Sequence, residues 1–197
     1  MPKLSVNALD HITDTPLNFE LVREHHNRPM TDDEAQDRLD TALHECAHLV
    51  AAIACKASIL HIELHAPHAP RGKPAGRVKS DGILLEHEAF MSFAGHVWEF
   101  KRHNGDARRA VNDLKEGIDY ARELGVPHQP IYDAADHFVN VSASKAVRDA
   151  AVGVVCLMPK TGMLRDAKLA HLVRWLRPRI QAPEYLSRLH RSFHNLK

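Results

Sequence analysis

The sequence predicts a mainly α-helical (α+β) protein with one small β element. Apolar residues recur at steps of three and four over most of the chain after residue 30, which is the spacing of amphipathic helices. One segment, residues 58–65, instead alternates between apolar and polar side chains as a strand does. The chain has 197 residues, of which 44% are hydrophobic and 26% charged, so it is long enough for one globular domain with a substantial core.

The spacing of apolar residues is irregular before Thr31 and helical after it. Residues 1–30 show weak periodicity and contain three prolines, so we expect an irregular N-terminal arm with a short helix near Phe19–His26. Thr31 and Glu34 have the spacing of a capping box, in which each side chain accepts a backbone N–H of the first helical turn. The helix that begins here should run to about Lys56. Its expected buried stripe consists of Leu39, Leu43, Ala47, Val50 and Ala54.

This helix contains an H-E-x-x-H motif, His44-Glu45-Cys46-Ala47-His48. Residues four apart lie on one face of a helix, so His44 and His48 can offer two imidazole nitrogens to one metal ion. Glu45 can reach a water at such a metal and act as its general base. Cys46 points to the opposite side of the helix, where we expect it to pack rather than to bind metal.

The β element follows the motif helix. Residues 58–65 predict a strand, and one of its faces carries Ile59, His61, Glu63 and His65. A Pro/Gly-rich loop over residues 67–76 and a short strand at residues 77–79 should come next. The regular alternation places three histidines at the surface rather than at a metal, namely His61, His65 and His68.

Helical spacing continues to the end of the chain. The expected helices cover residues 86–103, 106–124, 132–158 and 164–176, and a last one begins at Pro183. The apolar stripe of the first consists of Phe90, Phe93, Val97 and Phe100, and the core positions of the second are Ala110, Leu114, Ile118 and Ala121. Asp106 is the expected N-cap of the second helix, and Gly125 followed by Pro127 should end it.

Composition excludes some classes of function. The net charge is +1, so nothing in the overall charge points to nucleic acid or an anionic membrane. Charge is uneven, however: residues 1–40 hold four basic and nine acidic residues, and residues 165–197 hold eight basic and two acidic ones. Three cysteines without C-x-x-C spacing fit a reducing compartment, and no apolar stretch is long enough for a transmembrane helix. We therefore expect a cytoplasmic protein.

A catalytic zinc usually has three protein ligands and an open position for water, so a third ligand is needed. The extended motif that supplies it from the same helix fails, because Ala51 and Ala54 stand where Gly and His would be. The remaining candidates are Glu86, Glu88, His96, Glu99 and Asp113. Asp113 lies in mid-helix beside core positions, where a buried carboxylate needs a partner such as a metal. Spacing alone does not choose among the five.

Four blocks, in order, resemble the peptidase domain of the FtsH-type zinc metalloproteases. His44-Glu-Cys-Ala-His48 is similar to that family's H-E-A-G-H, and Ile62 to Val78 is similar to its strand followed by P-R-G-x-A-L-G. Ala94-Gly-His-Val-Trp-Glu99 resembles G-G-R-x-A-E, and Ala110-Val-Asn-Asp-Leu114, followed by Ala121-Arg122, resembles the A-S-N-D-L…A-R helix. The resemblance covers about residues 38–178. Within it, His96 stands where the family has Arg.

The resemblance implies a helical, zincin-like peptidase domain, which we expect to cover residues 31–178. From the sequence pattern we expect the irregular arm, residues 1–30, before it and a basic C-terminal helix, residues 179–197, packed on the same domain. The resemblance implies a Zn²⁺ site in which Asp113 is the third ligand beside His44 and His48, with Glu45 as the catalytic base. It also implies that an edge strand binds an extended substrate by β-augmentation, through Gly76, Arg77 and Val78.

The implied function is a zinc-dependent endopeptidase that cleaves unfolded or flexible polypeptides, or a single regulatory target such as a repressor. No Walker motif occurs and only about forty residues precede the H-E-x-x-H motif, so we expect any ATP-driven unfolding to need a separate ATPase partner. The protein could also form a homo-oligomer, which the sequence does not decide. The alternative is a peptidase-like adaptor without activity. A third interpretation is nucleic-acid binding through the basic C-terminal helices, but we expect neither nucleic acid nor a membrane as partner.

Overall fold

The computed structural model describes residues 9, 12–26, 29–65, 76–105, 110–158 and 162–188. Its α-helices are α1 (Phe19–Glu24), α2 (Asp32–Ala54), α3 (Leu85–Arg102), α4 (Val111–Glu123), α5 (His128–His137), α6 (Ser144–Leu157) and α7 (Asp166–Leu176). Its strands are β1 (Ser58–Leu64), β2 (Gly76–Asp81) and β3 (Met163–Arg165), and short helical turns cover Ile12–Asp14, Phe138–Ser142 and Arg177–Arg179. The predicted fold class, mainly helical with a small β element, is confirmed.

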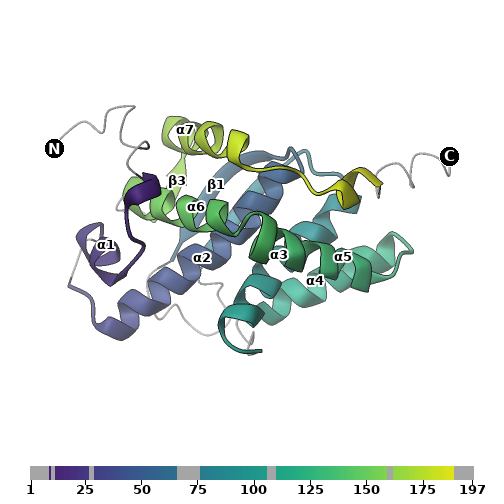
Figure 1. Cartoon of the computed structure of the whole chain (residues 1–197), viewed down its shortest axis with the longest axis horizontal. Coiled ribbons are helices and arrows are strands. Elements are labelled where there is room, and N and C mark those ends of the chain that lie inside the picture. The colour runs from purple at the N-terminus through teal and green to yellow at the C-terminus, as the bar shows by residue number, and fades with distance from the viewer. Residues whose placement is uncertain are drawn as a thin grey trace.

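Helix α2 is the centre of the molecule. Figure 1 shows it running diagonally through the fold, with α1 near its start, α6 and α7 along one side, and α3, α4 and α5 grouped at the other. Its two closest helical neighbours are α3 and α6. The helix that carries the H-E-x-x-H motif is therefore enclosed by other elements, and its polar residues must find partners inside the protein.

The capping box that predicts the start of α2 is present. The Thr31 hydroxyl accepts a hydrogen bond from the Glu34 backbone N–H at 3.2 Å, and the Glu34 carboxylate accepts one from the Thr31 N–H at 3.0 Å. The helix ends at Ala54, two residues before the predicted end at Lys56. Its whole predicted stripe is buried, and so is Cys46, which lies in the hydrophobic core. Burial of this stripe is what stabilises α2 in place.

The three strands form an antiparallel sheet in the order β2-β1-β3, so β2 is an edge strand. In β1, Ile62 and Leu64 face the core and His61 is half-buried; His65, which follows the strand, is exposed. Arg38 of α2 ties down the end of this strand, because its guanidinium donates to the carbonyl oxygens of Leu64 at 2.8 Å and His65 at 2.5 Å. The predicted loop after β1, with His68 and the Pro70 to Ala75 part of the second family block, lies outside the described residues.

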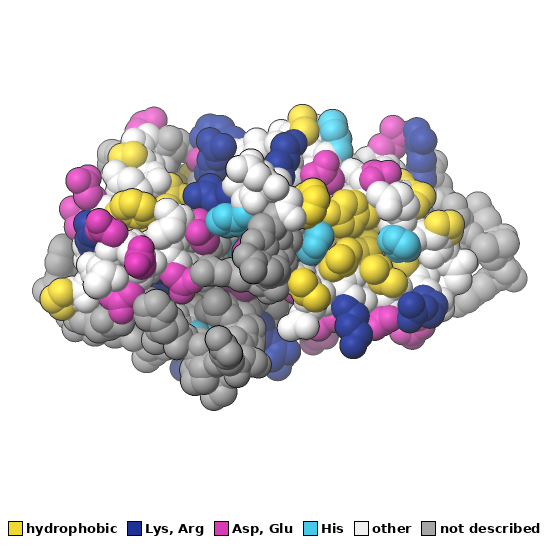
Figure 2. All heavy atoms as spheres, turned by 90° about the horizontal axis from the view of Figure 1, so that it is seen from below, with side chains coloured by type: hydrophobic (Ala, Val, Ile, Leu, Met, Phe, Trp, Pro, Cys, Tyr) yellow, Lys and Arg dark blue, Asp and Glu magenta, His cyan; other side chains and the backbone are white. Residues whose placement is uncertain are grey.

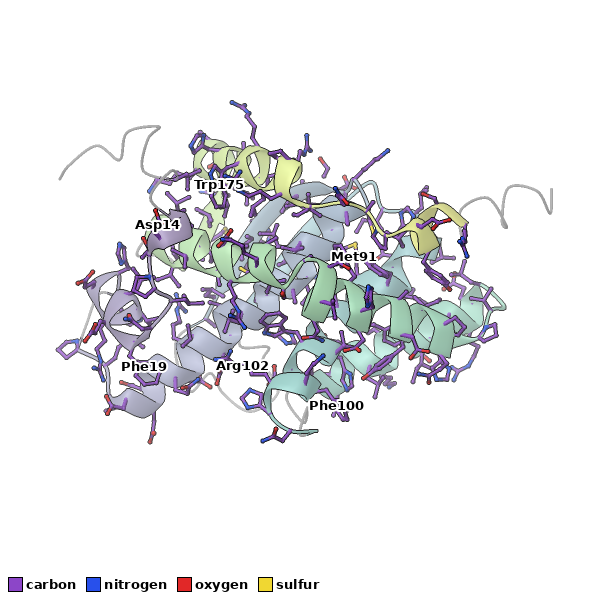
Figure 3. The ribbon with its side chains drawn as sticks, viewed as in Figure 1. Asp14, Phe19, Met91, Phe100, Arg102 and Trp175 are labelled. Carbon is purple, nitrogen blue, oxygen red and sulfur yellow. The ribbon has the colours of Figure 1, made fainter. Side chains whose placement is uncertain are left out.

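Helix α3 carries most of its predicted stripe, but Phe100 is 47% exposed. It lies in the last turn of α3, and Figure 3 shows Phe100 at the lower edge of the molecule, whereas Arg102 of the same turn lies toward α2, where it pairs with Asp40 at 3.2 Å. Helical spacing predicts which face of α3 a residue lies on but not whether a neighbouring element covers it, so Phe100 belongs to the predicted stripe and is still exposed. For α4, Ala110 and Ala121 are buried, whereas Leu114 and Ile118 are only partly covered; the predicted cap Asp106 falls outside the described residues.

The prediction of one helix over residues 132–158 is wrong. The chain forms α5, a π-helical turn at Phe138–Ser142 and then α6. The break occurs where Asn140 and Ser142 weaken helical propensity. The side-chain amide of Asn140 also donates to the backbone oxygen of Val97 in α3, at 3.1 Å, which anchors the turn to α3.

The prediction for residues 164–176 is wrong at its start. Residues 163–165 pair with β1 as a third strand, with Leu164 opposite Ile62, and α7 begins only at Asp166. The backbone of Gly162 passes so close that an added Cβ would lie 2.7 Å from the Leu64 carbonyl oxygen. A segment of three residues is too short to show the alternation that marks a strand in a sequence.

The ends of the described chain pack on the same body. Four residues before α2 are buried in the core, namely Leu9, Ile12, Leu21 and Val22. After Pro183 the chain is helical again over residues 184–188, and Leu186 is buried. Figure 2 shows acidic side chains gathered toward the end of the molecule where α1 and the start of α2 lie, and a group of hydrophobic side chains exposed on the opposite half. Within the described residues, no helix combines the length and the apolar character needed to cross a lipid bilayer.

Candidate metal centre

Three potential ligands converge where α2, α3 and α4 meet. His44 and His48 lie one turn apart on α2, and Asp113 lies in the first turn of α4. The two imidazole Nε2 atoms are 3.2 Å apart, and Asp113 Oδ2 is 3.1 Å from Nε2 of His44 and 3.5 Å from Nε2 of His48. In the part of the chain that the structure describes, this is the one group of three His, Cys, Asp or Glu side chains close enough to hold a metal ion.

The spacing of the three atoms can be tested against the geometry of a metal site. Zinc–nitrogen and zinc–oxygen bonds of about 2.0–2.1 Å in a tetrahedron separate neighbouring ligand atoms by about 3.3–3.4 Å. The observed separations of 3.1, 3.2 and 3.5 Å lie on both sides of this value. The ligands could therefore hold an ion with only small side-chain movements.

The second nitrogen of each imidazole also faces an acceptor. Nδ1 of His48 lies 2.8 Å from the backbone oxygen of Met91 in α3, and Nδ1 of His44 lies 3.1 Å from Oε2 of Glu99 in the same helix. The second contact is at ion-pair distance, although the N–H is not aimed well enough to form a regular hydrogen bond. Such acceptors fix the tautomer that leaves Nε2 free to bind a metal, and a carboxylate also increases the basicity of the ring.

Helix α3 approaches the imidazoles because Gly95 has no side chain. An added Cβ would lie 2.8 Å from Cε1 of His44 and 2.6 Å from Cε1 of His48, and closer still to Nε2 of His48. Real Cβ atoms do not come this near, so any other residue would push the helix or the imidazoles away. Gly95 therefore allows Met91 and Glu99, which lie four residues before and after it, to reach the two rings.

Glu45 lies against the start of the edge strand. A Cβ added to Gly76 would be 2.6 Å from Cγ and 2.8 Å from Oε1 of Glu45. Gly76 pairs with Leu64, whose carbonyl is held by Arg38, so this approach is fixed by the sheet. Burial lowers the pKa of Arg38 to about 10, which still leaves the guanidinium charged at neutral pH. Glu45 is thus held between the motif helix and the strand, and it is only 5% exposed.

The cluster attracts positive charge. Burial opposes protonation of His44, but Asp113 and Glu99 outweigh it and raise the pKa of this imidazole well above its ordinary value; Asp113 likewise raises the pKa of His48. Burial alone would raise the pKa of Asp113, but His48 and His44 hold it well below its usual range. A divalent cation would supply the positive charge that protonated imidazoles supply otherwise. Burial also raises the pKa of Glu45, against the opposing influence of the two histidines.

The structure separates the five candidates for the third ligand. Asp113 joins the cluster, and Glu99 lies behind His44 at its Nδ1 rather than at Nε2. His96 is buried and hydrogen-bonded through Nδ1 to the Tyr132 hydroxyl, at 3.2 Å. Glu88 is not in the cluster, and its pKa is raised by burial and by Glu116. The side chain of Glu86 is not among the described atoms.

The three residues predicted to bind substrate differ in their burial and in what they contact. Gly76 lies against Glu45, whereas Arg77 is exposed and Val78 is half-buried and packs against the core. The sequence assigns no role to two further features of the site. The Met91 carbonyl is a backbone group with no sequence signal. Gly95 belongs to the third family block, Ala94 to Glu99, but its only signal is that of a glycine inside a helical pattern, which usually indicates close packing.

Comparisons with protein-family models, with curated proteins and with solved structures found no match. The resemblance to FtsH-type peptidase domains therefore rests on the four sequence blocks and stays a prediction.

Proposed function

We propose that this protein is a zinc-dependent endopeptidase related to the peptidase domain of FtsH-type metalloproteases. The observation that carries the proposal is the triangle of His44 and His48 on α2 and Asp113 on α4, with separations of 3.1–3.5 Å. Glu45 lies on α2 between the two histidines. Two imidazoles and one carboxylate, in a site with a neighbouring glutamate, form the donor set of metal-assisted hydrolysis. Zinc is the metal that we propose for it.

When bound, zinc supplies a Lewis acid that acidifies water and polarises a carbonyl group. His44, His48 and Asp113 hold the ion, and the acceptors Glu99 and Met91 orient the imidazoles. Glu45 accepts the proton from the attacking water as its oxygen bonds to the peptide carbonyl carbon. Glu45 then gives this proton to the amide nitrogen as the C–N bond breaks, which releases an amine and a carboxylic acid. Its raised pKa suits a group that must both accept and donate a proton.

The substrate that we propose is an extended polypeptide. Strand β2 is an edge strand, and its first residue, Gly76, touches Glu45. Among the described residues, no strand pairs with the outer edge of β2. A peptide that pairs there gains main-chain hydrogen bonds whatever its sequence, and this pairing would bring it next to the general base. Because a folded protein cannot present such a segment, the substrate class is unfolded or flexible protein. Folded targets would need a separate ATPase.

The test is cleavage of a chemically unfolded, fluorescently labelled protein by the wild type and by Glu45→Gln. Both proteins should contain zinc, and a chelator should stop wild-type cleavage. Glu45→Gln should lower cleavage by about 10²–10⁴-fold, the usual contribution of a general base. Cleavage by Glu45→Gln at the wild-type rate would reject Glu45 as the base, and cleavage that survives zinc removal would reject the metal mechanism.

The alternative is a peptidase-like adaptor that binds polypeptides without cutting them. One observation favours it: Glu45 is only 5% exposed, so the base is nearly closed off in this conformation. An adaptor would bind unfolded polypeptide equally well with and without zinc and leave it intact. An endopeptidase would lose the substrate by cleavage only in the zinc-loaded form.

A further inference from the structure

The edge strand β2 carries two cations on its outer face. Along this strand Gly76 is buried, and Val78 is half-buried and packs against the core. Arg77 and Lys79, which alternate with them, are exposed. Side chains two residues apart lie on the same face of a strand, so both cations point away from the core, on the side opposite to Val78.

Neither cation has an ion-pair partner in the described part of the chain. Arg77 lies opposite Glu63 of β1, but the two oxygens of that carboxylate face the strand's own histidines, at 3.3 Å from Nε2 of His61 and 3.8 Å from Nε2 of His65. Lys79 lies opposite His61, which is not an acidic group. Both positive charges are therefore left available on the outer face of the sheet.

The outer face has one acidic group on β2 itself. Asp81 ends the strand, at the end away from Gly76, and its carboxylate accepts the backbone N–H of Gly82 at 2.7 Å. The half of β2 nearer to Glu45 thus carries positive charge only.

A peptide that pairs with the outer edge of β2 becomes the next strand of the sheet. Its side chains alternate between the two faces, and each lies opposite one residue of β2, with about 4.5–5.5 Å between the Cβ atoms. Peptide residues opposite Gly76 and Val78 face inward, on the side of Glu45, which a Cβ on Gly76 would contact. Peptide residues opposite Arg77 and Lys79 face outward, next to the two cations.

The two cations make this edge selective. Opposite charges that face each other across two strands stabilise the pairing, whereas like charges oppose it. A basic segment on this edge would place cations against Arg77 and Lys79, and an acidic segment would place carboxylates there. The same side chains therefore reject one class of segment and favour the other, which is how specificity is usually built.

We propose that Arg77 and Lys79 determine substrate specificity, and that the segment they select is extended and carries acidic side chains at two alternating positions. This inference rests on the proposed endopeptidase function and narrows its substrate class. Because Arg77 and Lys79 follow Gly76 by one and three residues, both acidic residues should lie on the same side of the cleaved bond.

The experiment uses four fluorogenic peptides that share one neutral host sequence. They carry Asp at two alternating positions, Asp at two adjacent positions, Asn at the alternating positions, or Lys at the alternating positions. Alternating side chains lie on one face of a strand and adjacent ones on opposite faces. The two Asp peptides therefore have the same charge and differ only in how they match β2.

The proteins compared are the wild type and three double variants. Arg77→Glu with Lys79→Glu reverses both charges, and Arg77→Gln with Lys79→Gln removes them and keeps the proposal testable if the first variant does not fold. The control, Lys168→Glu with Arg174→Glu, changes the net charge equally at two exposed positions of α7. Zinc content and the far-ultraviolet circular dichroism spectrum are measured first for each protein.

The readout is a ratio of kcat/KM values, which does not depend on the overall activity of a variant. The wild type and the control should favour the alternating Asp peptide over the Asn peptide by about 3–10-fold, as expected for two cross-strand charge pairs. The adjacent Asp peptide should gain less, and about 1 M salt should reduce the preference. The charge-reversal variant should favour the Lys peptide, and the glutamine variant should treat the Asp and Asn peptides alike.

Equal ratios for the alternating and adjacent Asp peptides would overturn the proposal, and so would an acidic preference that survives charge reversal. A second measurement does not depend on cleavage: zinc-loaded Glu45→Gln is titrated with the same peptides, and binding is followed by fluorescence anisotropy. Selective binding without any cleavage by the wild type would reject the endopeptidase and keep the selective edge. Cleavage by the wild type without a preference among the peptides would reject the selective edge and keep the endopeptidase.

Discussion

Helix α2 packs against α3 on one side and α6 on another, and the two contacts are built from different groups. Toward α3 it presents His44 and His48, which meet the Met91 carbonyl, the Glu99 carboxylate and the bare backbone of Gly95. The buried side of α6 is almost wholly apolar: its buried residues are Ala146, Val147, Ala150, Ala151, Val152, Val154, Val155 and Leu157, with Gly153 and the charged Asp149. Asp149 is paired with Lys145.

We expect the contact of α2 with α6 to contribute mainly to stability and the contact with α3 mainly to metal binding. Apolar burial is non-directional and stabilises the fold roughly in proportion to the area removed from water, so the α6 side tolerates small shifts. The α3 side depends on distances of about 3 Å between named atoms and is therefore directional. Substitutions on the apolar side should lower the free energy of unfolding and leave metal affinity unchanged. Substitutions on the polar side should lower metal affinity and change the free energy of unfolding less.

The largest expected effect is in the apolar layer behind the α6 side, where α7 packs on α6, for Leu172→Ala. Leu172 of α7 is fully buried and lies against Gly153 of α6. Its truncation leaves a cavity and should lower the free energy of unfolding by about 2–5 kcal/mol, as measured by urea denaturation. The zinc affinity of the folded protein should not change. A large loss of zinc affinity would show that the two sides are coupled.

Gly95→Ala, on the polar side, should lower zinc affinity rather than stability. The new methyl group overlaps the imidazoles of His44 and His48, so we expect zinc affinity to fall by at least about 100-fold, as measured by competition with a fluorescent chelator. Helical content should stay close to that of the wild type, since alanine favours a helix.

The matched control is Gly117→Ala on α4. This glycine is packed as tightly, but against the ring of Phe93, with an added Cβ 2.6 Å from Cδ1. It should cost about 1–3 kcal/mol of stability through overpacking and leave zinc affinity unchanged. If both alanine variants lose zinc equally, then α3 and α4 move as one body and the comparison between polar and apolar contacts fails.

Helix α2 and strand β1 could be predicted from the sequence because their signals are local. Other parts of the fold could not be predicted in this way. The capping box at Thr31 and Glu34 and the stripe of α2 are local signals of a long helix, and the alternation in β1 is equally local. Phe100, the break near Asn140 and the strand at Leu164 depend on what packs beside each segment, which spacing does not reveal.

The candidate metal centre also combines residues that local signals predict with residues that only packing brings together. The positions of His44, Glu45 and His48 follow from helical geometry alone. Asp113 is 65 residues beyond His48 in the sequence, and only the resemblance selected it from five candidates. The structure then brings it to the two imidazoles through the packing of α3 on α4. The roles of Gly95 and of the Met91 carbonyl could not be found, because each is a close approach of the α3 backbone to a histidine side chain of α2.

Glu99→Gln should have a smaller effect than Gly95→Ala. Glutamine keeps the shape of the side chain but removes the charge that faces Nδ1 of His44. Loss of such an outer partner typically lowers metal affinity by about 10–100-fold, which isothermal titration with zinc can measure. An unchanged affinity would mean that the contact at 3.1 Å, which is not a well-aimed hydrogen bond, does not orient the ring.

The smallest expected effect is at the far end of α2, for Thr31→Ala. The loss of this N-cap should lower the free energy of unfolding by about 1 kcal/mol, which a shift in the midpoint of urea denaturation would show. Zinc affinity should stay within twofold of the wild type, because His44 lies more than three turns away. A clear loss of zinc would show that fraying of the first turn reaches the motif.

The central claim is that His44, His48 and Asp113 bind one zinc ion. The direct measurement is zinc per chain, by mass spectrometry of the elements, for untagged wild type, Asp113→Asn and the control Asp119→Asn, whose carboxylate is exposed on the same helix. We predict about one zinc per chain in the wild type and in Asp119→Asn, and a clear loss in Asp113→Asn. No zinc in the wild type even after its addition, or equal zinc in all three proteins, would contradict the account.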